Sequence, residues 1–252
     1  MKRSLILRLI FSLCLICLTS MEAKAQMQDD YFNKPDSLPV APARTDTTKK
    51  VKFVYPLYNG FSVGTNILEP ILNAFGQEYG SYEVIAEANI LNRFWPEISF
   101  GIGQSNYTND DDIRYKVKPS FFGRIGMSYN FLYGKERPNA LLLSFRYGFS
   151  SYKADIFGLQ YDNGYWPATP TFDILDQKFT SHWIEVGFGI RVPVHKNIQM
   201  GWMVYYKPML SAGDTKNAQP WFVPGYGLYG SGFGVSYQVY FHLPSKKEKV
   251  KK

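Results

Sequence analysis

The sequence predicts an all-β fold, an antiparallel up-and-down barrel of eight strands. Large apolar residues alternate with small or polar ones in segment after segment, as in Phe233 to Leu243, and a period of two indicates strands with two different faces. Short and long connections alternate along the chain, and an even number of strands returns both ends of the barrel to one side. Aromatic residues make up 17% of the 252 residues, which suits a β-protein that needs many aromatic anchors.

Residues 1–25 are predicted to be an export signal rather than part of the fold. A basic start (Met1–Arg3) precedes an apolar stretch, and Ala23–Ala25 form a small-x-small cleavage site. A membrane anchor is the alternative, but a spanning helix needs about 20 apolar residues. Both cysteines, Cys14 and Cys17, lie in this segment, so the mature chain has no thiol for a disulfide or a metal site.

The barrel is predicted to occupy residues 55–243, between a flexible periplasmic linker (26–54) and a basic periplasmic tail (244–252). The linker is rich in Pro, Asp and Thr and lacks apolar periodicity, so it cannot bury enough surface to become ordered. The net charge of +7 arises in the signal and the tail, and the remainder of the chain is formally neutral. The sequence therefore does not predict nucleic-acid binding, which requires basic residues on a folded surface.

Eight alternating segments follow in order, each bounded by glycine or other turn residues. They are residues 58–67, 81–91, 97–105, 118–132, 140–153, 179–192, 197–208 and 230–243. The short connections are 92–96, 133–139 and 193–196, and the long ones are 68–80, 106–117, 154–178 and 209–229. Residues 67–76 could form one or two turns of helix, but Pro70 and their short length make them a loop element at most. Tight periplasmic turns and longer extracellular loops are typical of transmembrane barrels.

The two faces of these segments differ in charge. The apolar face is predicted to point outward and carries no charge, because a Lys or Arg facing lipid at the bilayer midplane costs about 2–4 kcal/mol. The other face is predicted to line the lumen with four acidic and four basic residues, beside many glycines that leave room for them. These are Glu83, Glu87, Glu97, Glu185, Arg124, Arg146, Arg191 and Lys207. Side chains can fill an eight-stranded barrel, so the sequence predicts a lumen closed by a salt-bridged network.

Aromatic residues are frequent in the two longest connections. Among them are Tyr161, Tyr165, Trp166, Trp221, Phe222 and Tyr226. They are predicted to lie on extracellular loops, where exposed aromatic side chains often form an adhesive or ligand-binding surface. The alternative is an aromatic girdle at the membrane interface, with loops that pack on each other.

The sequence predicts no catalytic, cofactor-binding or metal site. Gly225–Gly230 matches the dinucleotide-binding pattern G-x-G-x-x-G in its letters, but no buried parallel strand precedes it and no helix follows. Ser181 and His182 are neighbours on a strand and point to opposite faces, which is poor geometry for proton transfer. With His195 and His242, the histidines are too few and too scattered to bind a metal ion. We therefore expect a protein that is not an enzyme and has no cofactor.

In its signal, its strand and loop rhythm and its aromatic last strand (Tyr237–Leu243), the chain resembles the small outer-membrane β-barrel proteins of Gram-negative bacteria, the eight-stranded OmpA/OmpX-like group. Many such barrels end on an aromatic residue, whereas eleven residues follow Phe241 here. The resemblance implies a monomer in the outer membrane that contacts lipid and lipopolysaccharide and is inserted by the barrel-insertion machinery. It implies a structural or surface-interaction role with an unknown external ligand.

Three other functions remain open at this point. The same barrel could form a narrow channel, or it could carry lipid-modifying activity, as a few barrels of this size do. A soluble, lipocalin-like periplasmic barrel is the third, although the uncharged outward faces argue against it.

Overall fold

The computed structural model describes residues 55–134, 139–160, 171–213 and 218–245. The predicted signal and the whole of the predicted linker lie outside these residues, as does most of the tail. Among the described residues, strands dominate and one short helix is present. No helix in this part of the chain is long and apolar enough to cross a membrane.

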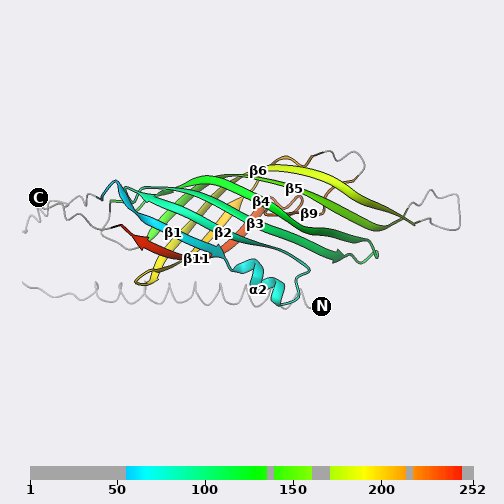
Figure 1. The fold of residues 1–252 in the computed structure, drawn as a ribbon, viewed down its shortest axis with the longest axis horizontal. Coiled ribbons are helices and arrows are strands. Elements are labelled where there is room, and N and C mark those ends of the chain that lie inside the picture. Colours follow the sequence, from blue (N-terminus) through cyan, green and yellow to red (C-terminus); the bar gives the residue numbers. More distant parts are fainter. Residues whose placement is uncertain (1–54, 135–138, 161–170, 214–217, 246–252) are drawn as a thin grey trace, which may run out of the picture. The chain divides into compact units, whose positions relative to one another are not determined.

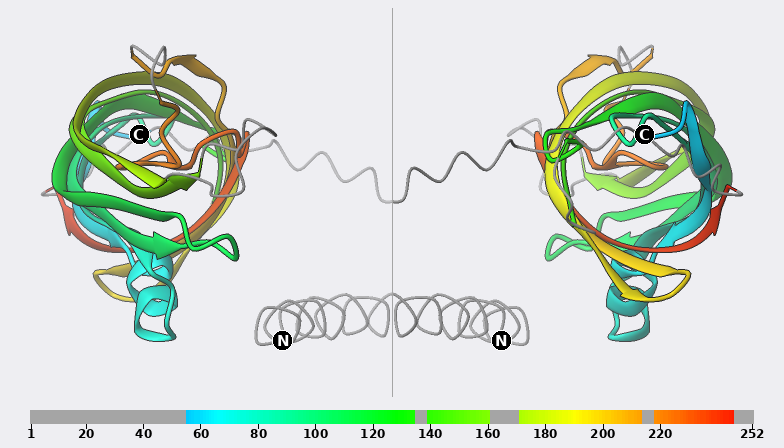
Figure 2. Two further views of the ribbon diagram at one scale, coloured as in Figure 1. Left: turned by 90° about the vertical axis from the view of Figure 1, so that its right-hand side faces the viewer. Right: turned by 90° about the vertical axis from the view of Figure 1, so that its left-hand side faces the viewer.

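Eight long antiparallel strands form a closed ring among the described residues (Figures 1 and 2). They are β1 (Tyr58–Asn66), β2 (Tyr79–Ile90), β3 (Phe94–Thr108), β4 (Arg114–Asn130), β5 (Ala140–Gln160), β6 (Thr171–His195), β7 (Ile198–Tyr206) and β11 (Phe233–Pro244). Each strand pairs with its neighbour in the sequence, and β11 pairs with both β7 and β1, which closes the ring. The predicted all-β, up-and-down architecture is confirmed.

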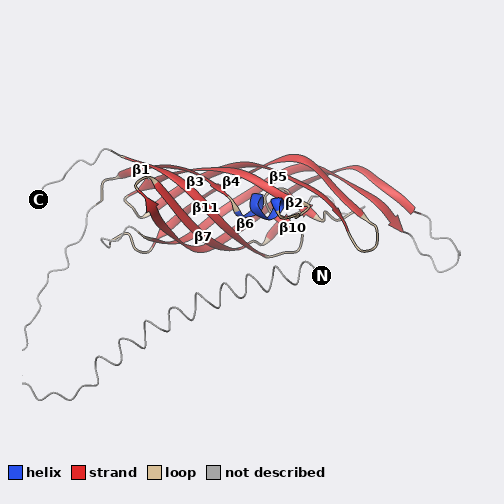
Figure 3. Cartoon of the chain, turned by 90° about the horizontal axis from the view of Figure 1, so that it is seen from below, coloured by secondary structure: helices blue, strands red, loops and turns tan. Residues whose placement is uncertain are grey.

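Four short elements lie in two of the longer connections (Figure 3). They are α2 (Leu68–Ala74), β8 (Met209–Ser211), β9 (Phe222–Val223) and β10 (Gly227–Leu228). The predicted loop element at residues 67–76 is thus a seven-residue helix. Pro70 is compatible with it because proline is tolerated in the first turn, where backbone N–H groups have no helical partner.

The predicted contrast between long and short connections holds only in part. β3 and β4 stay paired as far as Thr108 and Arg114, and β5 and β6 as far as Gln160 and Thr171. The connection predicted at 106–117 therefore shrinks to 109–113, which is shorter than the turn at 131–139. Backbone pairing thus continues beyond the segments in which the apolar alternation is regular. Below, the end of the barrel with the connections 91–93, 131–139 and 196–197 is called the turn end, and the opposite end the hairpin end.

Side-chain burial alternates along much of the ring, as in β5, where buried and exposed residues follow one another from Leu142 to Ser151. The buried face points into the ring and holds two apolar clusters in addition to charged groups. One cluster, around Trp95, Leu142 and Tyr205, lies toward the turn end. The other, around Phe122 and Trp183, lies toward the hairpin end. The interior is therefore packed with side chains.

Candidate functional site

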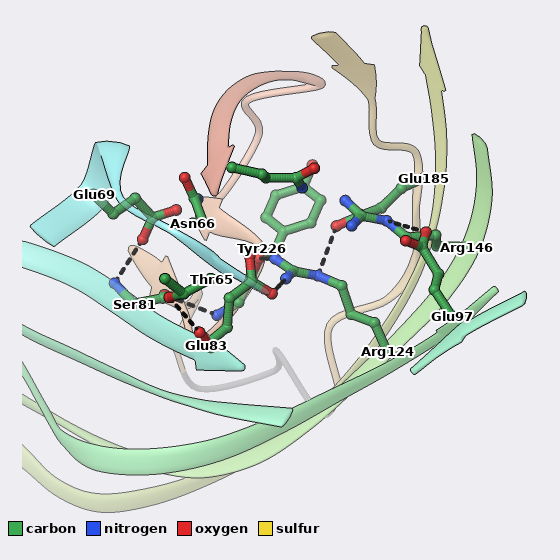
Figure 4. Close-up of polar contacts among 12 residues, drawn as sticks. Thr65, Asn66, Glu69, Ser81, Glu83, Glu97, Arg124, Arg146, Glu185 and Tyr226 are labelled. Atoms are coloured by element: carbon green, nitrogen blue, oxygen red, sulfur yellow. Dashed lines mark hydrogen bonds and ion pairs between the residues drawn. The ribbon is translucent and has the colours of Figure 1, made fainter. Parts of the chain in front are cut away.

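A chain of alternating charges crosses the lumen (Figure 4). Arg124 of β4 pairs with Glu83 of β2, and its Nε donates to Glu185 Oε1 of β6 at 3.1 Å. Arg146 of β5 reaches the other oxygen of Glu185, and its Nε lies 3.8 Å from Glu97 Oε1. Five residues from five strands thus form one ion-pair chain centred on Glu185.

A separate ion pair lies nearer the turn end. Arg191 of β6 donates from Nη1 to Glu87 of β2, and its guanidinium carbon lies 3.7 Å from the ring centre of Tyr240 and 4.7 Å from that of Trp95. Glu87 faces Glu97 directly across β2 and β3. Like charges in that position repel each other, so each carboxylate depends on its own arginine.

Glycine makes room for the long charged side chains, as the sequence predicts. Arg124 lies opposite Gly148 in the ladder, Arg146 opposite Gly126 and Arg191 opposite Gly201. A Cβ at Gly126 would lie 2.6 Å from Arg146 Cγ, a distance that real Cβ contacts do not show. Gly126 therefore leaves the space that the Arg146 side chain occupies inside the ring.

These charges are removed from water almost completely. Glu185 is 0% exposed, Arg146 3% and Arg124 7%. Besides the two arginines, Glu185 accepts a hydrogen bond from Trp183 Nε1 at 2.8 Å. Buried charges are stable only when they are paired and hydrogen-bonded, so the ion-pair chain acts as a unit in which each member supports the next.

The eighth predicted residue, Lys207, forms no ion pair with any described residue. Its Nζ donates to the backbone oxygen of Tyr226 and lies 5.0 Å from the centre of that ring. Sequence reasoning missed Glu69 of α2, whose Oε2 accepts from the Ser81 N–H at 2.6 Å. Desolvation raises the pKa of Glu69, although the Arg124 charge opposes this. The position of Glu69 beside Pro70, in the segment where one or two turns of helix were predicted, was the sequence signal that could have identified it.

The second part of the last long connection, after β8, folds into the ring (Figure 2). We call residues 218–231, with the small β9–β10 hairpin, the plug. Phe222, Val223 and Tyr226 are at most 3% exposed and pack against Phe122 and Trp183. Polar contacts tie the plug to the lumen, because Arg124 donates to the Gly225 oxygen and the Gly225 N–H donates to Ser81 Oγ at 3.2 Å.

The plug corrects the prediction that Trp221, Phe222 and Tyr226 are exposed loop aromatics. Phe222 and Tyr226 are buried, and Trp221 is half-buried and stacked on Tyr107 with ring centres 4.2 Å apart. The physical reason is that large apolar side chains of the strands, such as Phe122, Tyr152 and Trp183, line this part of the lumen, and the rings of the plug are removed from water by packing on them. The other three predicted loop aromatics, Tyr161, Tyr165 and Trp166, lie outside the described residues.

We expect Gly225→Ala to loosen the plug. Gly225 has φ +81° and an added Cβ would lie 2.4 Å from Phe122 Cδ2, whereas Gly230 has φ +80° with no atom within 4 Å. Both alanine variants carry the same backbone penalty, so their difference measures overpacking, which typically costs about 1–3 kcal/mol. The measurement is the free energy of unfolding from urea titrations. Equal stabilities of Gly225→Ala and Gly230→Ala would show that the plug is not packed on Phe122.

The chain that forms this barrel matches one protein family over most of its length. Residues 6–248 match the family described as a domain of unknown function, DUF6048. The chain belongs to this family. No curated protein matches this DUF6048 chain significantly. Among solved structures, the crystal structure of Neisserial surface protein A is similar over 73% of this chain and 95% of that one, with 13% identity and a TM-score of 0.39. So distant a similarity carries no argument about function.

Ser181 and His182 are the serine–histidine pair that the sequence brings together in the DUF6048 barrel. Ser181 is fully buried in the lumen, where its Oγ lies 3.5 Å from Tyr152 Oη. His182 is on the outward face and its Nδ1 lies 2.7 Å from Tyr147 Oη. The two candidates for a serine–histidine pair are thus on opposite sides of the wall, as predicted. The described part of the chain also contains no group of three acidic, histidine or cysteine side chains placed to hold a metal ion.

Proposed function

We propose that the chain is an outer-membrane β-barrel whose ring spans the bilayer, with a structural or surface-interaction role. The observation that carries this proposal is a belt of exposed apolar side chains around the whole ring. Each long strand contributes at least one member that is between 40% and 60% exposed: Val63, Val84, Phe100, Ile125, Phe145, Phe188, Val204 and Val235.

The belt is costly in water and favourable in lipid. Soluble monomers rarely expose contiguous apolar patches larger than a few hundred Å², and a belt around a barrel exceeds this. A hydrocarbon environment also requires every backbone N–H and C=O to be paired, which a closed ring achieves and an open sheet does not. A lipocalin-like soluble barrel would instead present polar residues outward.

The turn end is proposed to face the periplasm. Gly60 pairs with Pro244, so the chain enters and leaves the barrel at this end, on the same side as the predicted linker and tail. The hairpin end, where the β5–β6 hairpin projects farthest, would then face outward and meet lipopolysaccharide (Figure 1).

Cell fractionation with unboiled and boiled gel samples tests the location. We expect the protein in the outer-membrane fraction, with a mobility that changes on heating because the hydrogen-bonded ring resists detergent until it is boiled. Recovery of the chain in the soluble periplasmic fraction, with one mobility, would contradict the proposal.

We further propose that the lumen does not conduct. The ion-pair chain and the plug occupy successive levels of an interior that is only wide enough for side chains. The test is conductance in planar bilayers, where the purified protein is expected to give no steady current. A steady ion current would favour the narrow-channel alternative.

A further inference from the structure

The turn end of the barrel contains a cavity of about 220 Å³ that the proposed function does not use. Side-chain amides dominate its lining: Asn59, Asn89, Asn92, Asn130, Asn139 and Gln199. Trp95 and His242 also line it, and none of the described residues around it is Asp, Glu, Lys or Arg. Such a lining offers hydrogen-bond donors and acceptors in equal measure without a fixed charge, so it suits an uncharged polar ligand.

The amides differ in how many of their hydrogen-bonding atoms already have a partner within the protein. Asn130 is committed to the fold: its Oδ1 accepts from the Leu132 and Leu141 N–H groups, and its Nδ2 donates to the Asn92 oxygen at 2.9 Å. Asn89 is different, because Nδ2 donates to Asn92 Oδ1 at 3.3 Å but Oδ1 has no partner among the described residues.

Trp95 is the second residue with unused hydrogen-bonding capacity. It is 4% exposed, and its Nε1 has no acceptor among the described residues. A buried polar group without a partner costs free energy. A buried donor and a buried acceptor at one cavity, with no neighbour to satisfy them, therefore favour a ligand that supplies both complements.

We propose that this cavity binds one ring of an uncharged N-acetylated sugar. Sugar hydroxyl groups can donate to Asn89 and accept from Trp95, and an acetamido group presents the same C=O and N–H pair as the amides around it. The volume is slightly below the range of about 300–1,000 Å³ typical of small-molecule sites. It therefore accommodates a single ring, either a free sugar or the end of a glycan chain.

The test measures sugar binding to the purified full-length protein in a detergent without a sugar head group. Ligand-observed NMR with N-acetylglucosamine, glucose and chitotetraose as probes detects weak binding and compares the three. We expect saturable binding of N-acetylglucosamine and about five- to tenfold weaker binding of glucose, the effect of losing about one hydrogen bond. Competition by chitotetraose indicates recognition of a chain end, and its failure indicates a site for the free sugar.

Matched variants separate the cavity from the rest of the molecule. Trp95→Phe keeps an aromatic ring, although a smaller one, and removes the donor, and Asn89→Leu removes the amide; each is expected to weaken N-acetylglucosamine binding at least fivefold. The controls are Trp202→Phe on the outward face and Asn73→Leu on α2, which should bind as the parent does. Gln199→Leu replaces any cavity variant that fails to show the native gel mobility.

Two results would overturn the inference: no saturable binding of N-acetylglucosamine by the parent protein, or undiminished binding by the folded cavity variants. Equal affinity for glucose would overturn the assignment of an N-acetylated sugar. The assay uses purified protein, so its outcome is independent of the cell fractionation that tests the membrane location.

Discussion

Replacing Glu185 by Gln is expected to lower the free energy of unfolding by about 3–5 kcal/mol, the usual cost of breaking a buried ion pair from one side. Glutamine has the same shape but no charge, while Glu185 serves two arginines that are almost fully buried. Arg124 would keep its ion pair with Glu83, and Arg146 would keep its contact with Glu97. Both would lose the carboxylate that they share. Urea titration of the purified protein in lipid vesicles, followed by tryptophan fluorescence, measures the difference.

Glu78→Gln is the matched control, because Glu78 is exposed and its side chain belongs to no ion pair in the described part of the chain. We expect it to change stability by less than about 0.5 kcal/mol, as surface substitutions usually do. If Glu185→Gln were as stable as Glu78→Gln, the shared carboxylate would not hold the lumen together.

Phe188→Lys is expected to destabilise the protein in a bilayer by about 2–4 kcal/mol, the cost of a lysine facing lipid at the midplane. Phe188 lies on the outward face of β6, in the stretch that is paired with both β5 and β7, and is 52% exposed. In a soluble barrel the same change would remove an exposed apolar side chain and cost almost nothing. The sign and size of this single effect therefore distinguish a membrane barrel from a soluble one.

Val194→Lys provides the comparison within the same strand. Val194 is 61% exposed, six residues farther along the same face, and lies at the turn end where the membrane interface is expected. A lysine there should cost only about 0–1 kcal/mol. Unfolding titrations of both variants in lipid vesicles give the depth dependence, and equal costs at the two positions would contradict a bilayer centred on the ring.

The sequence predicts those features that repeat with a period of two. Alternation identified all eight strands of the ring, and the sorting of charge by face identified the seven buried charged residues of the ion pairs. Period-two patterns are strong because moving a strand by one residue would turn its entire apolar face inward. Glycines opposite the arginines were predictable for the same reason, since the space they leave is a property of a face.

Features that depend on three-dimensional register were not accessible in this way. Which acid meets which base depends on strand stagger, so the sharing of Glu185 between two arginines required the structure. The plug was predicted as a surface loop because Trp221–Tyr229 has no periodicity, and its burial depends on apolar side chains that β4, β5 and β6 bring together in the lumen. The cavity at the turn end gathers asparagines from separate turns and strands, which no local pattern relates.

Closure of the ring has a consequence for how the molecule forms. The pairing of β1 with β11 joins Phe61 to Leu243, so the contact that seals the wall involves the most distant parts of the barrel sequence. Contacts between distant residues carry a large loop-closure entropy and form slowly. Until β11 arrives, β1 and β7 each present an unpaired edge, the kind of surface that recruits other chains. Aggregation through these edges therefore competes with the pairing of β11 until the ring is closed.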